Sequence, residues 1–188
     1  GRDLRTGGWG SRADQLLRFE VLFRGIDPRG KTILDIGCGL GDLVPFLQER
    51  TEGDFQYIGI DVAERLIDDA KITHGNERCT FRCCDVFDAE LPEVDIAVLS
   101  GALSLRVEGI DDYAQRTMQR MYDLTREVAC LNFLSKYVDY ELEKNQHYQP
   151  ETVFGWARVV TKCVNLLHDY PLYEFTLQLV HSSTEIKK

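Results

Sequence analysis

Three glycines at alternating positions, Gly37, Gly39 and Gly41, follow a short apolar segment that ends in Asp35-Ile36. Glycine has no Cβ, so it adopts positive φ at little cost and lets the backbone approach a ligand closely. The amides of such a loop and the start of the helix after it can hold polar parts of a ligand. We therefore expect a ligand-binding turn here, with a purely structural turn as the alternative.

A carboxylate is expected at a matching place on the next strand. Asp61 ends the apolar segment 57–61, and an acid at the end of the second parallel strand can accept hydrogen bonds from both hydroxyls of a ribose. Asp61 could equally cap the helix that follows, and it could serve both purposes. The glycine loop and Asp61 together predict a ligand that contains adenosine.

These residues need a parallel sheet to bring them together, and the rest of the chain predicts one. Strands are expected at 32–36, 57–61, 80–84, 95–99, 128–133, 164–168 and 174–180, with helices from Ser11 to about 24, after Asp42, at 63–73, at 112–122 and after Pro150. We expect Asp42 to cap its helix. Strands that alternate with helices indicate an α/β, doubly wound, mostly parallel sheet covered on both faces.

The last two strands are expected to pair differently. Only residues 170–173 separate them, which is too short for a parallel crossover, so an antiparallel hairpin is predicted. Within the final strand Phe175, Leu177 and Leu179 alternate with Thr176 and Gln178, so we expect one face to pack against helices.

Length and composition set the class of protein. The 188 residues predict a single domain, 1–188, with an N-terminal helix or lid region at 1–30 and a core at 31–188. The chain has no apolar run long enough to span a bilayer, no leader-like start, and six scattered cysteines, which predicts a reducing, cytoplasmic setting. A net charge of -9 disfavours nucleic acid and favours a small-molecule partner, with a protein substrate as the other choice.

Four segments resemble conserved motifs of the class I S-adenosylmethionine-dependent methyltransferases. Residues 33–42 (ILDIGCGLGD) resemble motif I, and residues 57–62 (YIGIDV) resemble the second motif. Residues 84–86 (CDV) resemble the segment after the third strand, and residues 95–101 (DIAVLSG) resemble motif IV. The resemblance covers nearly the whole chain. It implies a Rossmann-like fold of seven strands in the order 3-2-1-4-5-7-6 with an antiparallel last strand, and S-adenosyl-L-methionine as the cofactor.

The resemblance also implies roles for individual residues. Gly37 and Gly39 would pack against the methionine part of the cofactor, and Asp61 would bind its ribose. Ser100 and Gly101 would face the amino acid moiety and the methyl-transfer zone, although a simple turn is the alternative there. The implied cofactor-binding set is Asp35, Gly37, Cys38, Gly39, Gly41, Asp61, Val62 beside the adenine, Asp85 and Val86 at the adenine edge, Ser100 and Gly101.

Residues on the acceptor side are less defined. Methyl transfer is an in-line displacement that depends mainly on positioning, and a base is needed only where the acceptor loses a proton. Candidate bases are His147, Tyr148 and His168, each of which could equally pack or form structural hydrogen bonds. Trp9 and Arg18 are candidates for a lid over the cofactor, with an exposed helix position as the alternative for Arg18.

Two other functions share parts of this pattern. A nicotinamide-dependent oxidoreductase would have the strand, the glycine loop and the acid, but its glycines are spaced GxGxxG and the terminal hairpin is foreign to it. A non-catalytic cofactor- or partner-binding module of the same fold is the stronger alternative. No metal is expected from Cys79, Cys83 and Cys84, because a strand sends neighbouring side chains to opposite faces and no paired CxxC follows. The sequence thus predicts a methyltransferase of a small molecule whose acceptor atom is not specified.

Overall fold

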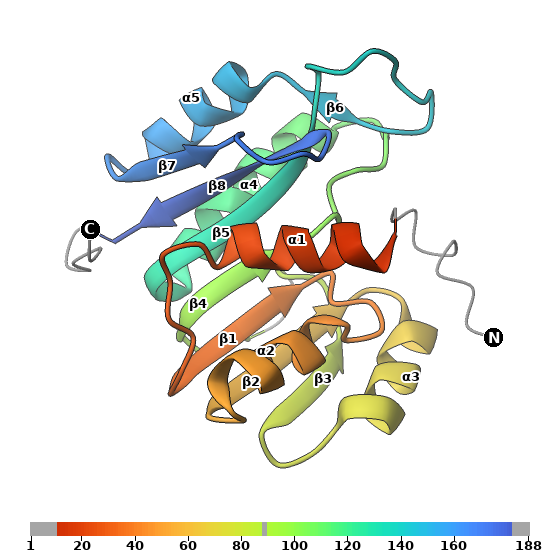
Figure 1. Cartoon of the computed structure of the whole chain (residues 1–188), viewed down its shortest axis with the longest axis vertical. Coiled ribbons are helices and arrows are strands. Elements are labelled where there is room, and N and C mark those ends of the chain that lie inside the picture. Colours follow the sequence, from red (N-terminus) through yellow and green to blue (C-terminus); the bar gives the residue numbers. More distant parts are fainter. Residues whose placement is uncertain (1–10, 88–89, 182–188) are drawn as a thin grey trace.

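The computed structural model describes residues 11–87 and 90–181 (Figure 1), which form one sheet with helices on both faces. The sheet order is β3-β2-β1-β4-β5-β8-β7, and a short β6 pairs with β5. The strands are β1 (Lys31–Ile36), β2 (Phe55–Asp61), β3 (Cys79–Cys83), β4 (Val94–Leu99), β5 (Thr125–Ser135), β6 (His147–Tyr148), β7 (Val164–Leu167) and β8 (Glu174–Val180). The helices are α1 (Arg12–Leu22), α2 (Leu43–Thr51), α3 (Glu64–His74), α4 (Ile110–Asp123) and α5 (Pro150–Val160).

The predicted strand order is confirmed once β6 is set aside, because β6 raises the numbers of the last two strands by one. β8 runs antiparallel to both β5 and β7, as expected for a terminal hairpin. β6 occupies a gap at the end of β5. β4 ends at Leu99, opposite Leu131, whereas β5 continues to Ser135, and the last residues of β5 pair with His147 and Tyr148 instead.

Two cores lie on opposite faces of the sheet. Alternate residues of a strand point to opposite faces, so Ile33 packs with α1, α2 and α3, whereas Leu34 packs with α4 and α5. In Figure 1, α1 and α2 lie in front of the sheet and α4 and α5 behind it. This arrangement leaves the carboxyl ends of the parallel strands at one edge, where ligands of such sheets bind.

The start of α1 lies at that same edge. Ser11 and Asp14 form the expected capping box, with Ser11 Oγ accepting from the Asp14 amide at 3.2 Å and Asp14 Oδ2 accepting from the Ser11 amide at 2.7 Å. The prediction that Asp42 caps α2 is wrong. Asp42 has helical backbone angles and makes no side-chain cap, and its Oδ2 instead accepts from Gln15 Nε2 at 3.1 Å. Asp42 therefore ties the glycine loop to α1.

Both faces of β8 are buried. Phe175, Leu177 and Leu179 belong to the core beneath α4 and α5, so the expected helix-packed face is confirmed. The opposite, polar face is covered as well, because Gln178 Nε2 donates to the carbonyls of Leu22 and Arg24 at 3.2 and 3.0 Å. These bonds hold the end of α1 over the sheet.

None of the helices within residues 11–87 and 90–181 is both long and apolar enough to cross a membrane.

Candidate functional site

The glycine loop and the end of β2 are joined by the carboxylate of Asp61. Its Oδ2 accepts from the amide of Gly39 at 3.0 Å, and its Oδ1 accepts from the amide of Ala63 at 2.9 Å, next to the start of α3. The structure thus places Asp61 at the start of the helix and against the loop at once. A carboxylate has about four acceptor positions, so both oxygens retain capacity for further donors such as ligand hydroxyls.

The three loop glycines all have positive φ, at 71°, 54° and 78° for Gly37, Gly39 and Gly41. A Cβ on Gly37 would lie 2.6 Å from the Cβ of Ala102, so this position needs glycine for a close approach to the loop after β4. A Cβ on Gly39 would meet none of the described residues within 4 Å. Gly39 is therefore the loop glycine that faces open space within the described part of the chain.

The expectation that the loop amides hold a ligand is wrong for four of them. Gly37 and Cys38 donate to the carbonyl of Ile60 at 2.8 and 3.0 Å, and Gly41 donates to the carbonyl of Cys38 at 2.9 Å. The Gly39 amide is bonded to Asp61, as described above. The loop satisfies its own donors, because a tight turn packed on a neighbouring strand brings carbonyls within reach of each amide.

Asp35 and Cys38 are buried beneath the loop. Burial raises the pKa of Asp35 to about 7, against the hydrogen bond that the Tyr57 hydroxyl donates to Asp35 Oδ2 at 2.7 Å, and the nearby carboxylates of Asp61 and Asp42 raise it further. Burial also raises the pKa of the Cys38 thiol well above its usual range. Cys38 is thus a neutral packing group.

The residues expected at the adenine lie in different environments. Asp85 accepts from the Phe87 amide at 2.9 Å and from the Tyr113 hydroxyl at 3.0 Å. The side chain of Val86 is buried in the core, so Val86 can meet a ligand only through its main chain. Val62 has 70% of its surface exposed at the end of β2, which leaves its side chain available.

The turn after β4 is fixed by a side chain that the sequence did not single out. Gly101 has φ 81°, and its amide donates to Asn132 Oδ1 at 2.8 Å. Ser100 precedes it, and the buried Ser100 hydroxyl has no hydrogen-bond partner among residues 11–87 and 90–181. An unpaired buried hydroxyl is unfavourable, so a ligand group that bonds with it would remove that penalty.

A series of buried, hydrogen-bonded side chains connects this turn to α1. Asn132 Nδ2 donates to Glu174 Oε2 at 2.7 Å, and Arg18 Nε donates to the same oxygen at 2.6 Å while Arg18 Nη2 pairs with Oε1. Arg18 has 4% of its surface exposed, so an exposed helix position is the wrong description of it. Arg18, Glu174, Asn132 and Gly101 connect α1, β8, β5 and the turn after β4.

The three candidate bases gather around the end of β5. The buried His147 has Nδ1 2.7 Å from the carbonyl of Ser135. A carbonyl can only accept, so Nδ1 must hold the proton and the neutral ring has its lone pair on Nε2. The Tyr148 hydroxyl donates to the carbonyl of Leu103 at 3.1 Å, and burial raises its pKa, so it remains protonated. The His168 ring contacts two other aromatic rings. It stacks on the ring of Tyr137, with 5.8 Å between the ring centroids, and meets the ring of Phe175 edge to face.

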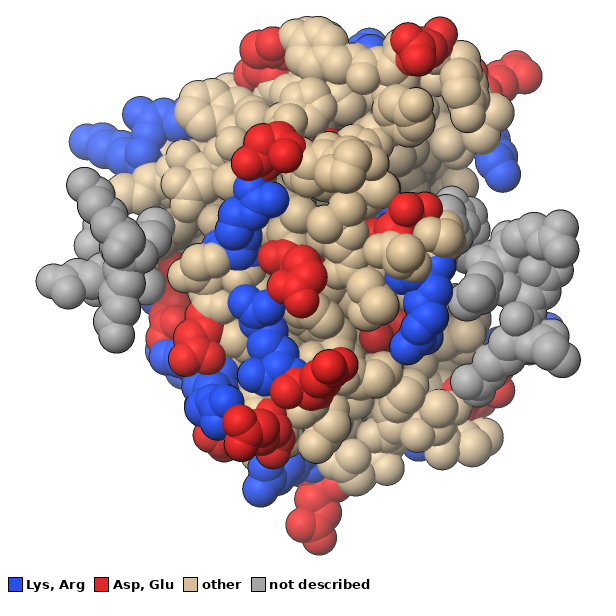
Figure 2. Space-filling view, viewed as in Figure 1, with Lys and Arg blue, Asp and Glu red and all other residues tan. Residues whose placement is uncertain are grey.

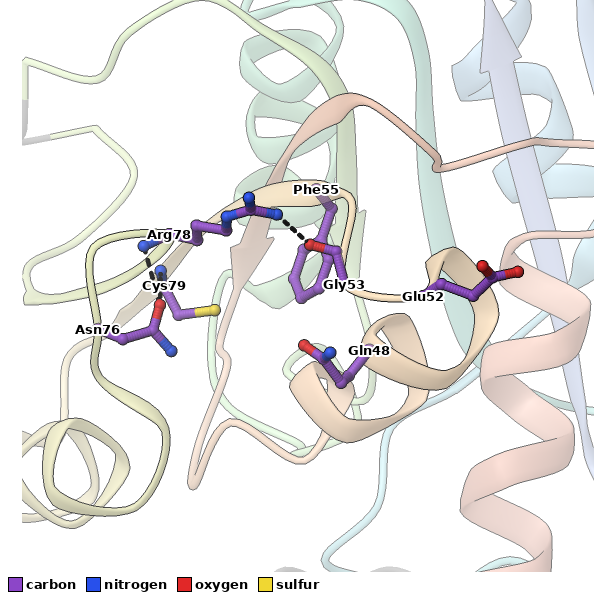
Figure 3. A pocket seen from close by; sticks show the side chains of 7 residues that line it. All are labelled: Gln48, Glu52, Gly53, Phe55, Asn76, Arg78 and Cys79. Carbon is purple, nitrogen blue, oxygen red and sulfur yellow. Dashed lines mark hydrogen bonds between the residues drawn. The ribbon is translucent and has the colours of Figure 1, made fainter.

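Two cavities lie away from the glycine loop. One of about 320 Å³ opens at the amino ends of β2 and β3, the edge opposite Asp61 (Figure 3). Arg78 reaches across it to the Gly53 carbonyl, and Asn76 accepts from the amides of Arg78 and Cys79. A smaller one of about 100 Å³ is lined by Asp111, Lys136, His147, Tyr148, Gln149, Thr152, Val153 and Trp156. The first lies at the wrong edge for the expected ligand, and the second is below the roughly 300 Å³ of common ligand sites.

Comparison with known proteins decides the family. A family model described as a methyltransferase domain matches residues 33–127. A Mycobacterium tuberculosis protein with the name "Putative methyltransferase Rv1506c" is 31% identical over an alignment of 154 residues, and the match covers 78% of this chain and 90% of that protein. The chain belongs to the class I S-adenosylmethionine-dependent methyltransferases.

Solved structures support the fold of this methyltransferase. The magnesium protoporphyrin IX methyltransferase of Synechocystis PCC 6803 with bound S-adenosylhomocysteine has a TM-score of 0.67 at 14% identity, over 93% of this chain and 89% of that one. An O-methyltransferase family protein of Burkholderia thailandensis has a TM-score of 0.71 at 15% identity, over 93% and 57%. At such identities the likeness establishes the Rossmann-like architecture.

One expected lid residue, Trp9, lies outside the described residues. Within those residues no group of three or more His, Cys, Asp or Glu is arranged to hold a metal ion.

Proposed function

We propose that this methyltransferase transfers the methyl group of S-adenosyl-L-methionine to a small-molecule acceptor beside Ser100 and Gly101. The observation that carries the proposal is the bond between Asp61 Oδ2 and the amide of Gly39, at 3.0 Å. It fixes a carboxylate with spare acceptor capacity beside a glycine that faces open space. An adenosine needs such a carboxylate for its ribose hydroxyls, and its neighbouring groups need a backbone without a Cβ.

The residues of the site fit this cofactor. Asp61 would accept hydrogen bonds from the ribose hydroxyls, and Val62 would cover the adenine. Gly39 would leave space for the part of the cofactor that links the ribose to the amino acid moiety. Ser100 has a buried hydroxyl without a partner in the described part of the chain, which suits the amino acid moiety. The conformation of the loop would be maintained by Asp35, Gly37, Cys38 and Gly41. Asp85 and Val86 would lie at the edge of the adenine, and Gly101 would lie beside the methyl group.

The bound cofactor supplies an electrophilic methyl on a sulfonium. The protein has to hold the acceptor in line, about 3 Å from that methyl, and exclude water. The hydrogen bond that the Gly101 amide donates to Asn132 Oδ1 keeps the turn at the methyl-transfer zone in one conformation. Where the acceptor is a hydroxyl or an ammonium, His147 is the candidate that can take its proton, because Nε2 has the lone pair.

A small-molecule acceptor agrees with the charges of the chain. The net charge is -9, and Figure 2 shows Lys and Arg interspersed with Asp and Glu over the face that α1 covers. Nucleic-acid binding needs clustered positive charge. Buried Cys38, Cys79 and Cys130 are free thiols, which supports a reducing, cytoplasmic location. The Synechocystis neighbour, by its name, methylates magnesium protoporphyrin IX, a small molecule.

Calorimetric titration with S-adenosylhomocysteine and incubation with methyl-labelled cofactor test the proposal. We expect S-adenosylhomocysteine to bind, and label from the cofactor to enter the low-molecular-weight fraction of a cell extract. Label in protein or nucleic acid alone would contradict the small-molecule acceptor. Binding without transfer to any fraction would favour the non-catalytic module, and tight binding of NAD in place of S-adenosylhomocysteine would contradict the proposed cofactor.

A further inference from the structure

Most of the exposed large hydrophobic residues in the described part of this protein belong to segments next to strand ends at one edge of the sheet. Within the described part of the chain, ten large hydrophobic residues are exposed, and six of them belong to three segments at the carboxyl edge of the sheet. We define these six as the apolar rim: Leu105, Val107, Tyr137, Tyr140, Leu142 and Tyr173. Their exposed fractions range from 48% to 69%. Single exposed apolar residues are ordinary, whereas a group of them marks a binding surface.

Main-chain hydrogen bonds pair residues 104–106, which contain Leu105, with residues 144–146, which follow Leu142 along the chain. The amide of Arg106 donates to the carbonyl of Lys144 at 3.0 Å, and the amide of Gln146 donates to the carbonyl of Ser104 at 3.0 Å. Leu105 and Asn145 form an antiparallel bridge between these bonds. The rim is therefore built on a short paired scaffold.

The third segment joins the rim through β5. The amide of Ser135 donates to the carbonyl of Tyr173 at 2.9 Å. This bond brings the turn before β8 against the beginning of the segment that contains Tyr137 and Tyr140. Tyr137 is further fixed by its ring contact with His168.

The rim is continuous with the methyl-transfer zone. Ser104 donates to the carbonyl of Gly101 twice, from its amide at 3.1 Å and from its hydroxyl at 2.5 Å. The next residue along the chain is Leu105, the first of the rim. Tyr148 braces the same loop from β6 through the carbonyl of Leu103. A molecule that places a reacting atom beside Gly101 would thus extend over the rim.

We propose that the acceptor of this methyltransferase has an alkyl or aromatic portion that lies on the apolar rim while its methylated atom lies beside Ser100 and Gly101. The inference rests on the proposed small-molecule acceptor and names its chemical class. The continuity of the rim with the turn after β4 favours the acceptor as occupant over a second copy of the chain. Ligand sites commonly combine an apolar lining with a few polar groups, and here the rim and the turn supply the two parts.

The experiment uses 4-alkylphenols, from 4-methylphenol to 4-hexylphenol, as probes. Their binding to the protein saturated with S-adenosylhomocysteine is measured by calorimetry, so that no turnover is required. We expect the Kd to fall about three- to fourfold for each added methylene that reaches the rim. The variant Leu105→Asn/Leu142→Asn should lose most of this dependence on chain length.

The control variant is Ile72→Asn/Val159→Asn, which changes two exposed apolar residues outside the rim and should keep the wild-type dependence. Both variants should bind S-adenosylhomocysteine as the wild type does, so failure of the cofactor site is seen separately. A wild type that binds S-adenosylhomocysteine but no alkylphenol would overturn the inference, as would a Kd independent of chain length. Concentration-dependent dimerisation that Leu105→Asn/Leu142→Asn abolishes would assign the rim to a second copy of the chain instead.

Discussion

Arg18 and Glu174 are 156 residues apart in the chain and form a bidentate ion pair in which both side chains are almost fully buried. The pair fastens α1 to the first residue of β8. Through Asn132 the same carboxylate is connected to Gly101. The docking of the N-terminal helix and the shape of the methyl-transfer turn therefore depend on one group.

Replacing Arg18 with Met should destabilise the protein by about 3–5 kcal/mol, because the Glu174 carboxylate would remain buried without its cation. Urea unfolding measures the change. The exposed pair of Arg24 and Asp169 gives a control, since Arg24→Met should change the free energy of unfolding by under about 1 kcal/mol. The double variant Arg18→Met/Glu174→Met should be less destabilised than the sum of its single variants; strict additivity would contradict the coupling.

The sequence predicted the parts of the site whose signals are local. The glycine loop and Asp61 each follow a buried strand, and the periodicity of those strands is sufficient to place both at one edge of the sheet. Asn132 and Glu174 gave no such signal. Each is a polar residue within a strand, and its role depends on partners that are 31 and 156 residues away.

Three further features depend on tertiary contacts. β6 has two residues, which are too few to show any periodicity. It forms because β5 extends beyond the end of β4 and its last residues are free to pair with another segment. Asp42 has the residue type and the sequence position of a helix cap, but its backbone angles are helical and its carboxylate accepts from Gln15 of α1 instead. The polar face of β8 is buried only because α1 returns over it, so Gln178 binds main-chain carbonyls at the end of that helix.

Asp61→Ala should weaken the binding of S-adenosylhomocysteine by roughly 1–3 kcal/mol, through loss of hydrogen bonds to a charged acceptor. The loss of the bond to Gly39 would also loosen the loop. Calorimetry measures the affinity, and Asp69→Ala on the exposed side of α3 is the matched control. Equal affinities in the two variants would remove Asp61 from the site.

Gly39→Ala should fold but bind S-adenosylhomocysteine poorly. Its positive φ makes alanine unfavourable by about 1–2 kcal/mol, and the new methyl group would project into the space that faces the ligand. Gly25→Ala has a similar backbone strain, with φ 74° and none of the described residues within 4 Å of the added Cβ, and lies outside the site. We expect similar melting temperatures for both variants and at least a tenfold weaker affinity for Gly39→Ala alone. Matching affinities would show that Gly39 does not approach the ligand.

Asp35 should make the stability depend on pH. Its pKa is raised to about 7 in the folded protein, whereas an unperturbed Asp titrates near 3.9. Between these values the folded state binds more protons than the unfolded state, so the free energy of unfolding falls as the pH rises from about 4 to 7. Asp35→Asn cannot ionise and should lose this decline.

The melting temperature of Asp35→Asn minus that of the wild type should thus increase with pH through this window and level off above it. Scanning fluorimetry across the window gives both curves, with Asp69→Asn as the control for an exposed carboxylate. A difference that stays constant would show that Asp35 is ionised throughout.

Ser100→Ala should separate folding from binding. The Ser100 hydroxyl is buried without a partner among the residues that the structure describes, so its removal should leave the free energy of unfolding unchanged or raise it by up to about 1–3 kcal/mol. If the hydroxyl bonds with the amino acid moiety, the same variant should bind S-adenosylhomocysteine about 2- to 12-fold more weakly, which corresponds to one hydrogen bond of about 0.5–1.5 kcal/mol. Urea unfolding and calorimetry on one preparation give the two quantities. Lower stability with unaltered affinity would mean that the hydroxyl serves the fold instead of the ligand.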